Sequence, residues 1–165
     1  MGLEVAAVHF KFFRKEEGFK EKVHEKLLET LKETERNLRK IITADFDGDG
    51  DLVDVANKLF VENNRTALQV RLMKVRDDIE SLSSMDLSRK SKVEVGALVT
   101  VDDDGKERIF LVVPESFSGF ETVEVDGKVV YTLSPKAPLY ASLKDREAGE
   151  ELYYDGEKMT IVEVV

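Results

Sequence analysis

Two long segments with apolar residues at three- and four-residue spacing place the strongest limit on the fold of this chain. In residues 14–42 the stripe consists of Leu27, Leu31, Leu38 and Ile41, with His24 and Thr34 in its polar positions and Phe19, Val23 and Leu28 widening it. In residues 52–84 it consists of Leu68, Leu72, Val75, Ile79 and Leu82, continued by Leu52, Ala56 and Leu59. This spacing places the side chains on one face of a helix.

Neither stripe can be buried by its own helix, so we expect the two helices to pair as an antiparallel coiled-coil hairpin. A chain reversal near residue 47 would place Leu38 opposite Ala56, and Leu27 opposite Ala67 or Leu68.

An acidic segment, Asp45 to Asp54, separates the two helical segments. It reads DFDGDGDLVD, with five aspartates in ten residues and no positive charge. Carboxylates this close disfavour one another's ionised forms and need solvent or a cation around them. The segment is therefore predicted to form the exposed tip of the hairpin.

The acidic segment has a local and a metal-binding interpretation. As local structure, Gly48 and Gly50 supply a turn, Asp51 caps the second helix, and Asp54 lies in its first turn. As a calcium loop, the aspartates take the first ligand positions of an EF-hand pattern, but its last ligand, a glutamate, is replaced by Ala56. On this second interpretation the candidate metal ligands are Asp45, Asp47, Asp49 and Asp51.

Composition excludes several classes of protein. The chain has 165 residues and no cysteine, so it has no disulfide framework and no thiolate chemistry. Its two histidines, His9 and His24, are too few for a histidine-based site, and a net charge of −9 argues against nucleic-acid binding by charge and against sequence-specific DNA binding. No segment is long and apolar enough to span a membrane, and no signal peptide is visible. We expect a monomeric cytoplasmic protein.

The second half of the chain changes to a β pattern after a polar linker at 83–92. Strands are predicted at 93–101, 107–113, 121–125, 128–133, 151–154 and 158–165, with a short helix from Ser134 to about Leu143. The turns between paired strands carry Asp-Gly, which is typical of two-residue hairpins. The predicted fold class is α+β: a helical hairpin domain at 1–88, and a small, mostly antiparallel β domain with one short helix at 89–165. The role of residues 1–13 is left open.

Four stretches in this order resemble the Gre family of bacterial transcript-cleavage factors. They are Gly50–Ala56 at the tip, Val95–Val101, Tyr131–Leu139 with its Ser-Pro pair, and Ala148–Glu150 before the terminal hairpin. The resemblance implies an FKBP-like C-terminal domain that docks at the rim of the secondary channel of RNA polymerase. It implies docking residues Ser134, Pro135, Ala137 and Leu139.

The resemblance also implies a mechanism in which the coil enters the channel and brings the tip beside the polymerase's catalytic Mg²⁺. Asp51 and Asp54 match the family's acidic tip pair and would help hold a second Mg²⁺ for cleavage of backtracked RNA. The protein would then be an accessory factor and not itself an enzyme, and it would act on the nascent RNA 3′ end only indirectly. Arg65, Arg71 and Arg76 would contact RNA or simply form a solvated helix face.

Departures from the family pattern keep the alternatives open. Asp54 is one methylene shorter than the family's Glu, Val55 replaces an Asn, and Lys58 replaces an aromatic residue. The additional aspartates resemble an inhibitory paralogue that occupies the channel. Three functions therefore remain: stimulation of transcript cleavage, inhibition by channel occupancy, and a Ca²⁺- or Mg²⁺-responsive adaptor that uses loop 45–56.

Overall fold

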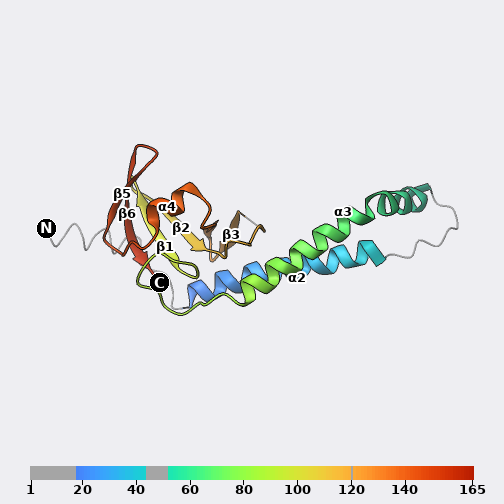
Figure 1. Cartoon of the computed structure of the whole chain (residues 1–165), viewed down its shortest axis with the longest axis horizontal. Helices are drawn as coiled ribbons and strands as arrows, with labels where there is room; N and C mark the ends of the chain where they lie inside the picture. The colour runs from blue at the N-terminus through green and yellow to red at the C-terminus, as the bar shows by residue number, and fades with distance from the viewer. Residues whose placement is uncertain (1–17, 44–51, 120) are drawn as a thin grey trace.

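The computed structural model describes residues 18–43, 52–119 and 121–165, and the side chains of residues 52–54 are outside this description. Two long helices form a hairpin that projects from a small β domain (Figure 1). Helix α2 runs from Phe19 to Thr43 and helix α3 from Leu52 to Ser83, close to the predicted limits. The predicted α+β class and the two N-terminal helices are therefore confirmed. An FKBP-like fold of the β domain and a domain boundary at residue 88 stay predictions.

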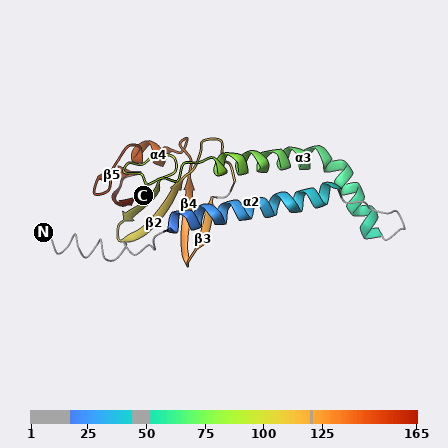
Figure 2. The same cartoon turned by 90° about the horizontal axis from the view of Figure 1, so that it is seen from below.

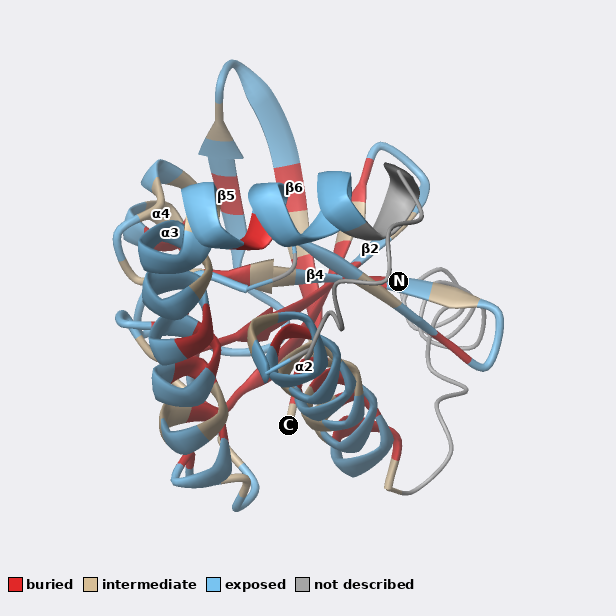
Figure 3. Cartoon of the chain, turned by 90° about the vertical axis from the view of Figure 1, so that its right-hand side faces the viewer, coloured by how far each residue is buried: buried red, intermediate tan, exposed pale blue. Residues whose placement is uncertain are grey.

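The predicted stripes form most of the contact between the helices. In their shared core the buried apolar side chains of α2 are Phe19, Val23, Leu27, Leu31 and Leu38. Those of α3 are Leu72, Val75 and Leu82, with Leu68 and Ile79 packed beside them. In Figure 3 the buried residues along the main part of α3 lie on the side that faces α2 and the sheet. Both helices thus need each other, and the sheet, to bury their apolar faces.

The predicted pairing of the two helices is wrong by several turns. Glu35 contacts Arg76 across the hairpin at 3.2 Å, and the Nε2–H of His24 donates to the carbonyl of Leu82 at 2.7 Å. Leu27 therefore lies level with the last turns of α3 and not with Ala67 or Leu68. Residues 68–82 carry the uninterrupted apolar stripe, so this part of α3 packs against α2. The first turns of α3 extend past the end of α2.

Two parts of the predicted stripes are not buried. Ile41 is exposed, and its neighbour Ile42 packs against the core instead. Ala56 and Leu59 are exposed, whereas Val61 is buried. Figures 1 and 2 show that α3 bends in its tip-side part. The bend explains why the simple three–four spacing does not extend through the first turns of α3.

The β domain is a six-stranded sheet with the order β3-β4-β2-β1-β6-β5. The strands are β1 (Leu98–Asp103), β2 (Lys106–Val112), β3 (Thr122–Val125), β4 (Lys128–Leu133), β5 (Glu151–Tyr154) and β6 (Glu157–Val164). All neighbours are antiparallel except β2 and β4, which pair in parallel. The three hairpins turn at Asp104-Gly105, Asp126-Gly127 and Asp155-Gly156, with positive φ at both residues of each turn. The predicted Asp-Gly turns are confirmed.

The two faces of the sheet pack against different partners. One face carries Leu98, Ile109, Leu111 and Val130 and shares a single apolar core with the hairpin. The other face carries Val99, Val101, Phe110 and Val112 and packs on Tyr140 and Leu143 of α4 (Pro138–Leu143). The sheet-side end of the hairpin, which we call its root, is thus continuous with the core of the β domain.

Two predicted boundaries differ from the structure. The first strand begins at Leu98 and not at residue 93, because Gly96 has a φ of 91° and the chain turns there. Helix α4 begins at Pro138, and Ser134 does not cap it. Ser134 instead closes a turn, in which its hydroxyl accepts from the N–H of Lys136 at 3.2 Å. Among the described helices, none is long and apolar enough to cross a membrane.

Candidate functional site

The far end of the hairpin is the place predicted for the functional residues. Helix α2 ends at Thr43 and α3 begins at Leu52, and both of these helix ends lie away from the sheet (Figure 1). Asp45, Asp47, Asp49 and Asp51 lie outside the described residues. Asp54 belongs to the first turn of α3, but its side chain is not described. The predicted tip pair and metal ligands therefore stay predictions.

No other metal site replaces the acidic segment in the part of the chain that the structure describes. No three His, Cys, Asp or Glu side chains there lie close enough together to hold an ion.

The outward face of α3 carries exposed apolar side chains, although Leu59 was predicted to belong to the buried stripe and Val70 and Met73 were not predicted to have a role. Val55, Leu59, Val70 and Met73 are 44%, 53%, 60% and 63% exposed. At 100° per residue they lie on the side of α3 opposite to Leu68, Leu72 and Val75. The sequence does contain a second set of regularly spaced apolar residues in this helix. It is overlooked when every apolar residue of the helix is assigned to a single face.

The three arginines predicted to contact RNA have different environments. Arg65 and Arg71 are exposed on α3. Arg76 pairs with Glu35, which also pairs with Arg39 of its own helix at 2.9 Å. Arg76 is thus part of the contact between the helices, whereas Arg65 and Arg71 form no ion pair with the residues that the structure describes.

The four predicted docking residues lie between the end of β4 and the first turn of α4. Ser134, Pro135, Ala137 and Leu139 are all partly exposed. Ala137 and Leu139 also pack against the core on the α4 side of the sheet, so part of each side chain has a structural role. Their use in docking stays a prediction.

The root of the hairpin is fixed to the β domain by polar contacts as well as by the shared core. The Asp78 carboxylate is buried in α3 and accepts from the N–H of Ser118 at 3.1 Å. Lys22 pairs with Asp126 in the β3–β4 turn at 3.2 Å. These contacts tie both helices to one end of the sheet, on the side where β3 and β4 lie.

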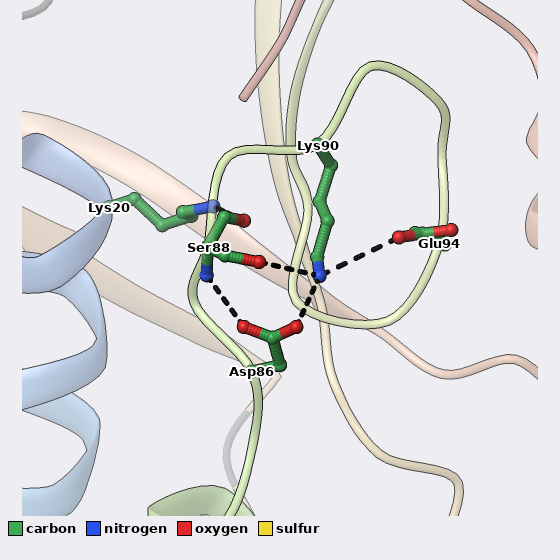
Figure 4. Close-up of polar contacts among 5 residues, drawn as sticks. All are labelled: Lys20, Asp86, Ser88, Lys90 and Glu94. Atoms are coloured by element: carbon green, nitrogen blue, oxygen red, sulfur yellow. Dashed lines mark hydrogen bonds and ion pairs between the residues drawn. The ribbon is translucent and has the colours of Figure 1, made fainter.

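The segment between α3 and β1 forms a third connection, shown in Figure 4. Lys20 is buried and donates to the carbonyl of Ser88 at 3.1 Å, and this burial lowers the pKa of its amine. Lys90 contacts Asp86 at 2.9 Å and Glu94 at 3.6 Å. The hydrogen bond from Lys90 holds the pKa of Asp86 well below its ordinary value. The predicted linker is therefore closely bound to α2 and to itself.

These contacts fix the root of the hairpin to the β domain. A hairpin whose root shares its core with a sheet holds whatever its far end carries at a set distance from that sheet.

Comparison with known proteins gives structural neighbours only. No family model and no curated protein matches the sequence. The solved structure of GreA factor homolog 1 (Gfh1) of Thermus thermophilus covers 86% of this chain and 94% of its own, with 18% identity and a TM-score of 0.34. Gfh1 of Thermus aquaticus covers 86% and 90%, with 16% identity and a TM-score of 0.35.

A third neighbour is described as the transcription factor Gfh1. It covers 86% of this chain and 92% of its own, with 19% identity and a TM-score of 0.33. At such values the alignments assign no residue of this chain a role. All three of these structures are of Gfh1, which the first of them describes as GreA factor homolog 1.

Proposed function

We propose that this protein is an RNA polymerase-binding transcription factor of the Gre type. Its β domain docks at the rim of the polymerase's secondary channel, and its hairpin enters the channel. The acidic tip then reaches the polymerase active site and stimulates cleavage of backtracked transcripts. The protein supplies ligands to that site and is not an enzyme on its own.

One observation supports the proposal most directly: the hairpin is long, anchored at one end, and acidic at the other. Helix α3 has 32 residues, which corresponds to about 48 Å along its axis, somewhat less after the bend. Its root is held by a shared core and by the contacts of Asp78, Lys22 and Lys20. A long hairpin anchored at one end can reach a reactive centre that lies deep inside a partner protein.

The chemistry proposed for the tip follows from what phosphodiester hydrolysis needs. Two metal ions stabilise the attacking and leaving oxygens, and the second ion is held weakly when its ligands are few. Carboxylates are suitable ligands because Mg²⁺ prefers oxygen and keeps several waters. Asp51 and Asp54 would add the missing oxygens and orient the attacking water.

A transcript-cleavage assay tests the proposal. Backtracked elongation complexes are incubated with the wild type, with Asp51→Ala/Asp54→Ala, and with the control Asp77→Ala/Glu80→Ala, across a Mg²⁺ series. The control removes two exposed carboxylates from α3 near its root, so it changes net charge equally and leaves the tip intact. We expect short 3′ RNA fragments with wild type and control, and a loss of at least tenfold with the tip variant, on the order of one lost charge-assisted contact.

Two other outcomes would redirect the proposal. If no fragments appear but nucleotide addition slows in a tip-dependent way, the protein is a channel-occupying inhibitor. If neither reaction changes and the protein does not bind polymerase, the Gre-type function is wrong.

A cation-responsive adaptor is the second candidate, because Asp45, Asp47, Asp49 and Gly50 keep the spacing of an EF-hand loop. Calorimetric titration of the full chain with Ca²⁺ and Mg²⁺ tests it directly. Heat at millimolar Ca²⁺ that is lost in Asp45→Asn/Asp47→Asn would support it. The absence of any binding at that concentration would remove this candidate.

A further inference from the structure

A hollow on the β domain combines exposed cations with exposed apolar groups. It has a volume of about 400 Å³ and lies between the parallel strands β2 and β4. Lys106, Arg108, Val129 and Tyr131 line it. By strand alternation Arg108 lies on the same face as Phe110, which is the face that packs on α4 and not the face that packs on the hairpin. Glu107, Ile109 and Lys128 also line it and lie on the other face by the same alternation, so the hollow lies where β2 and β4 begin.

Arg108 is held by one buried carboxylate and remains partly exposed. Its Nε donates to the buried carboxylate of Asp103 at 2.9 Å, while its own side chain is 45% exposed. A guanidinium has five N–H donors in a rigid plane, and one contact at Nε leaves the terminal nitrogens for another acceptor. Asp103 thus fixes the orientation of Arg108 without using its outer edge.

The apolar half of the hollow lies directly beside this arginine. In the parallel register Ile109 is opposite Val130 and Phe110 is opposite Tyr131, so Arg108 is level with Val129. Val129 and Tyr131 are both exposed, and the Tyr131 ring packs on Phe110 with 5.7 Å between centroids. Lys106 is exposed at the same end of β2. A cation fixed next to an apolar platform suits a ligand with a carboxylate beside an apolar side chain.

The neighbouring charges favour a protein over a nucleic acid. Arg108 is neutralised by Asp103, and Lys128 pairs with Glu107 at 3.3 Å. Among the described residues that line the hollow, this leaves Lys106 as the uncompensated cation, in a chain whose net charge is −9. Binding to a phosphate backbone needs several uncompensated cations, whereas a single acidic side chain needs one fixed arginine and a little added positive charge.

We propose that this hollow is a docking site for an acidic protein segment of RNA polymerase, one that places a carboxylate on Arg108 and Lys106 and an apolar side chain on Val129 and Tyr131. The proposal rests on the proposed function for the identity of the partner. It extends the predicted docking residues along β4, since Tyr131 is only three residues, or about 10 Å of strand, before Ser134. The contact would be continuous from the hollow to the β4–α4 connection.

Binding of the full-length protein to RNA polymerase core enzyme tests the site, with affinity measured by fluorescence anisotropy. The test variants are Lys106→Glu and Tyr131→Ala. The matched controls are Lys144→Glu, an exposed lysine after α4, and Tyr153→Ala, an exposed tyrosine on the other edge of the sheet. We expect each test variant to bind on the order of tenfold more weakly and each control to bind as the wild type.

A second measurement identifies the polymerase segment in contact with the hollow, and it does not depend on whether the Tyr131→Ala variant folds. A photo-crosslinking amino acid at Val129 should join the protein to an acidic segment of a polymerase subunit, and the same group at Tyr153 should not. If both test variants bind like wild type while the tip-dependent cleavage persists, the hollow is not a docking site and the proposed function stands. Crosslinking of Val129 to RNA alone would also overturn it. If the wild type does not bind polymerase at all, both proposals fail together.

Discussion

At the scale of single residues, positions at the root of the hairpin have little freedom. Gly96 has a φ of 91°, and a Cβ atom there would overlap the carbonyl oxygen of Asp86. The sequence carries no sign of this, because a glycine before a strand is common in loops. The position does not tolerate a side chain because the backbone of Asp86 lies directly beside it, and the ion pair of Asp86 with Lys90 holds that backbone there.

We predict that Gly96→Ala destabilises the protein far more than Gly127→Ala. Both residues have positive φ, which costs a non-glycine residue about 1–2 kcal/mol. A methyl group added at Gly127 would have no heavy atom within 4 Å, so this variant meets only the conformational cost. Gly96→Ala must also displace backbone. Urea unfolding of the two variants gives the comparison, and equal losses of stability would contradict it.

At the scale of elements, α3 is a bent helix, and its tip half differs from what the sequence pattern predicts. Its root half buries the predicted stripe against α2, but in another register than the one predicted. Its tip half carries the exposed residues Val55 and Leu59. It also bends, although the helix contains no proline or glycine from which a bend could be predicted. Asn64 donates to the carbonyl of Phe60 at 2.8 Å, a side-chain bond of the kind that competes with the helix's own bonds.

We predict that Leu27→Ala and Leu59→Ala have very different effects on stability, although both belong to the predicted apolar stripes of the hairpin. Leu27 is completely buried, so truncation should cost about 2–5 kcal/mol. Leu59 is more than half exposed, and its truncation should change stability by no more than about 0.5 kcal/mol. Chemical denaturation followed by circular dichroism of the helices measures both. A large loss for Leu59→Ala would mean that the outward face of α3 is covered.

At the scale of the whole molecule, the hairpin and the sheet share one core. Leu27 and Leu82 of the hairpin belong to the same buried cluster as Leu98 and Leu111 of the sheet. The sequence suggests two domains joined by a polar linker. The structure shows that Lys20 contacts the linker. It also shows that the start of α2 and the end of α3 pack in one core with the sheet.

We predict that the hairpin and the β domain unfold in a single transition. All four tyrosines, at 131, 140, 153 and 154, belong to the β domain and there is no tryptophan, so tyrosine fluorescence reports the sheet. Far-ultraviolet circular dichroism reports mainly the two long helices. The two midpoints in urea should coincide and should shift together in Leu82→Ala, because two-state unfolding requires agreement between probes. Separate midpoints would show that the root core does not couple the two parts.

Local patterns in the sequence are enough to predict the elements themselves. Three–four apolar spacing predicts α2 and α3 within a few residues, and Asp-Gly pairs predict all three hairpin turns, because both signals depend on neighbours close in the chain. The acidic character of the tip is also a property of the sequence alone. The clustering of Asp45 to Asp54 needs no tertiary contact to define it.

Tertiary structure decided how these elements are combined. The register of α2 against α3 depends on which stretch of each stripe is buried best, and this involves residues far apart in the chain, such as Glu35 with Arg76 and His24 with Leu82. The parallel pairing of β2 with β4 brings Arg108 level with Val129 and creates the hollow that we propose as a docking site. The contacts of Lys20 and Gly96 at the root likewise exist only because distant segments meet there.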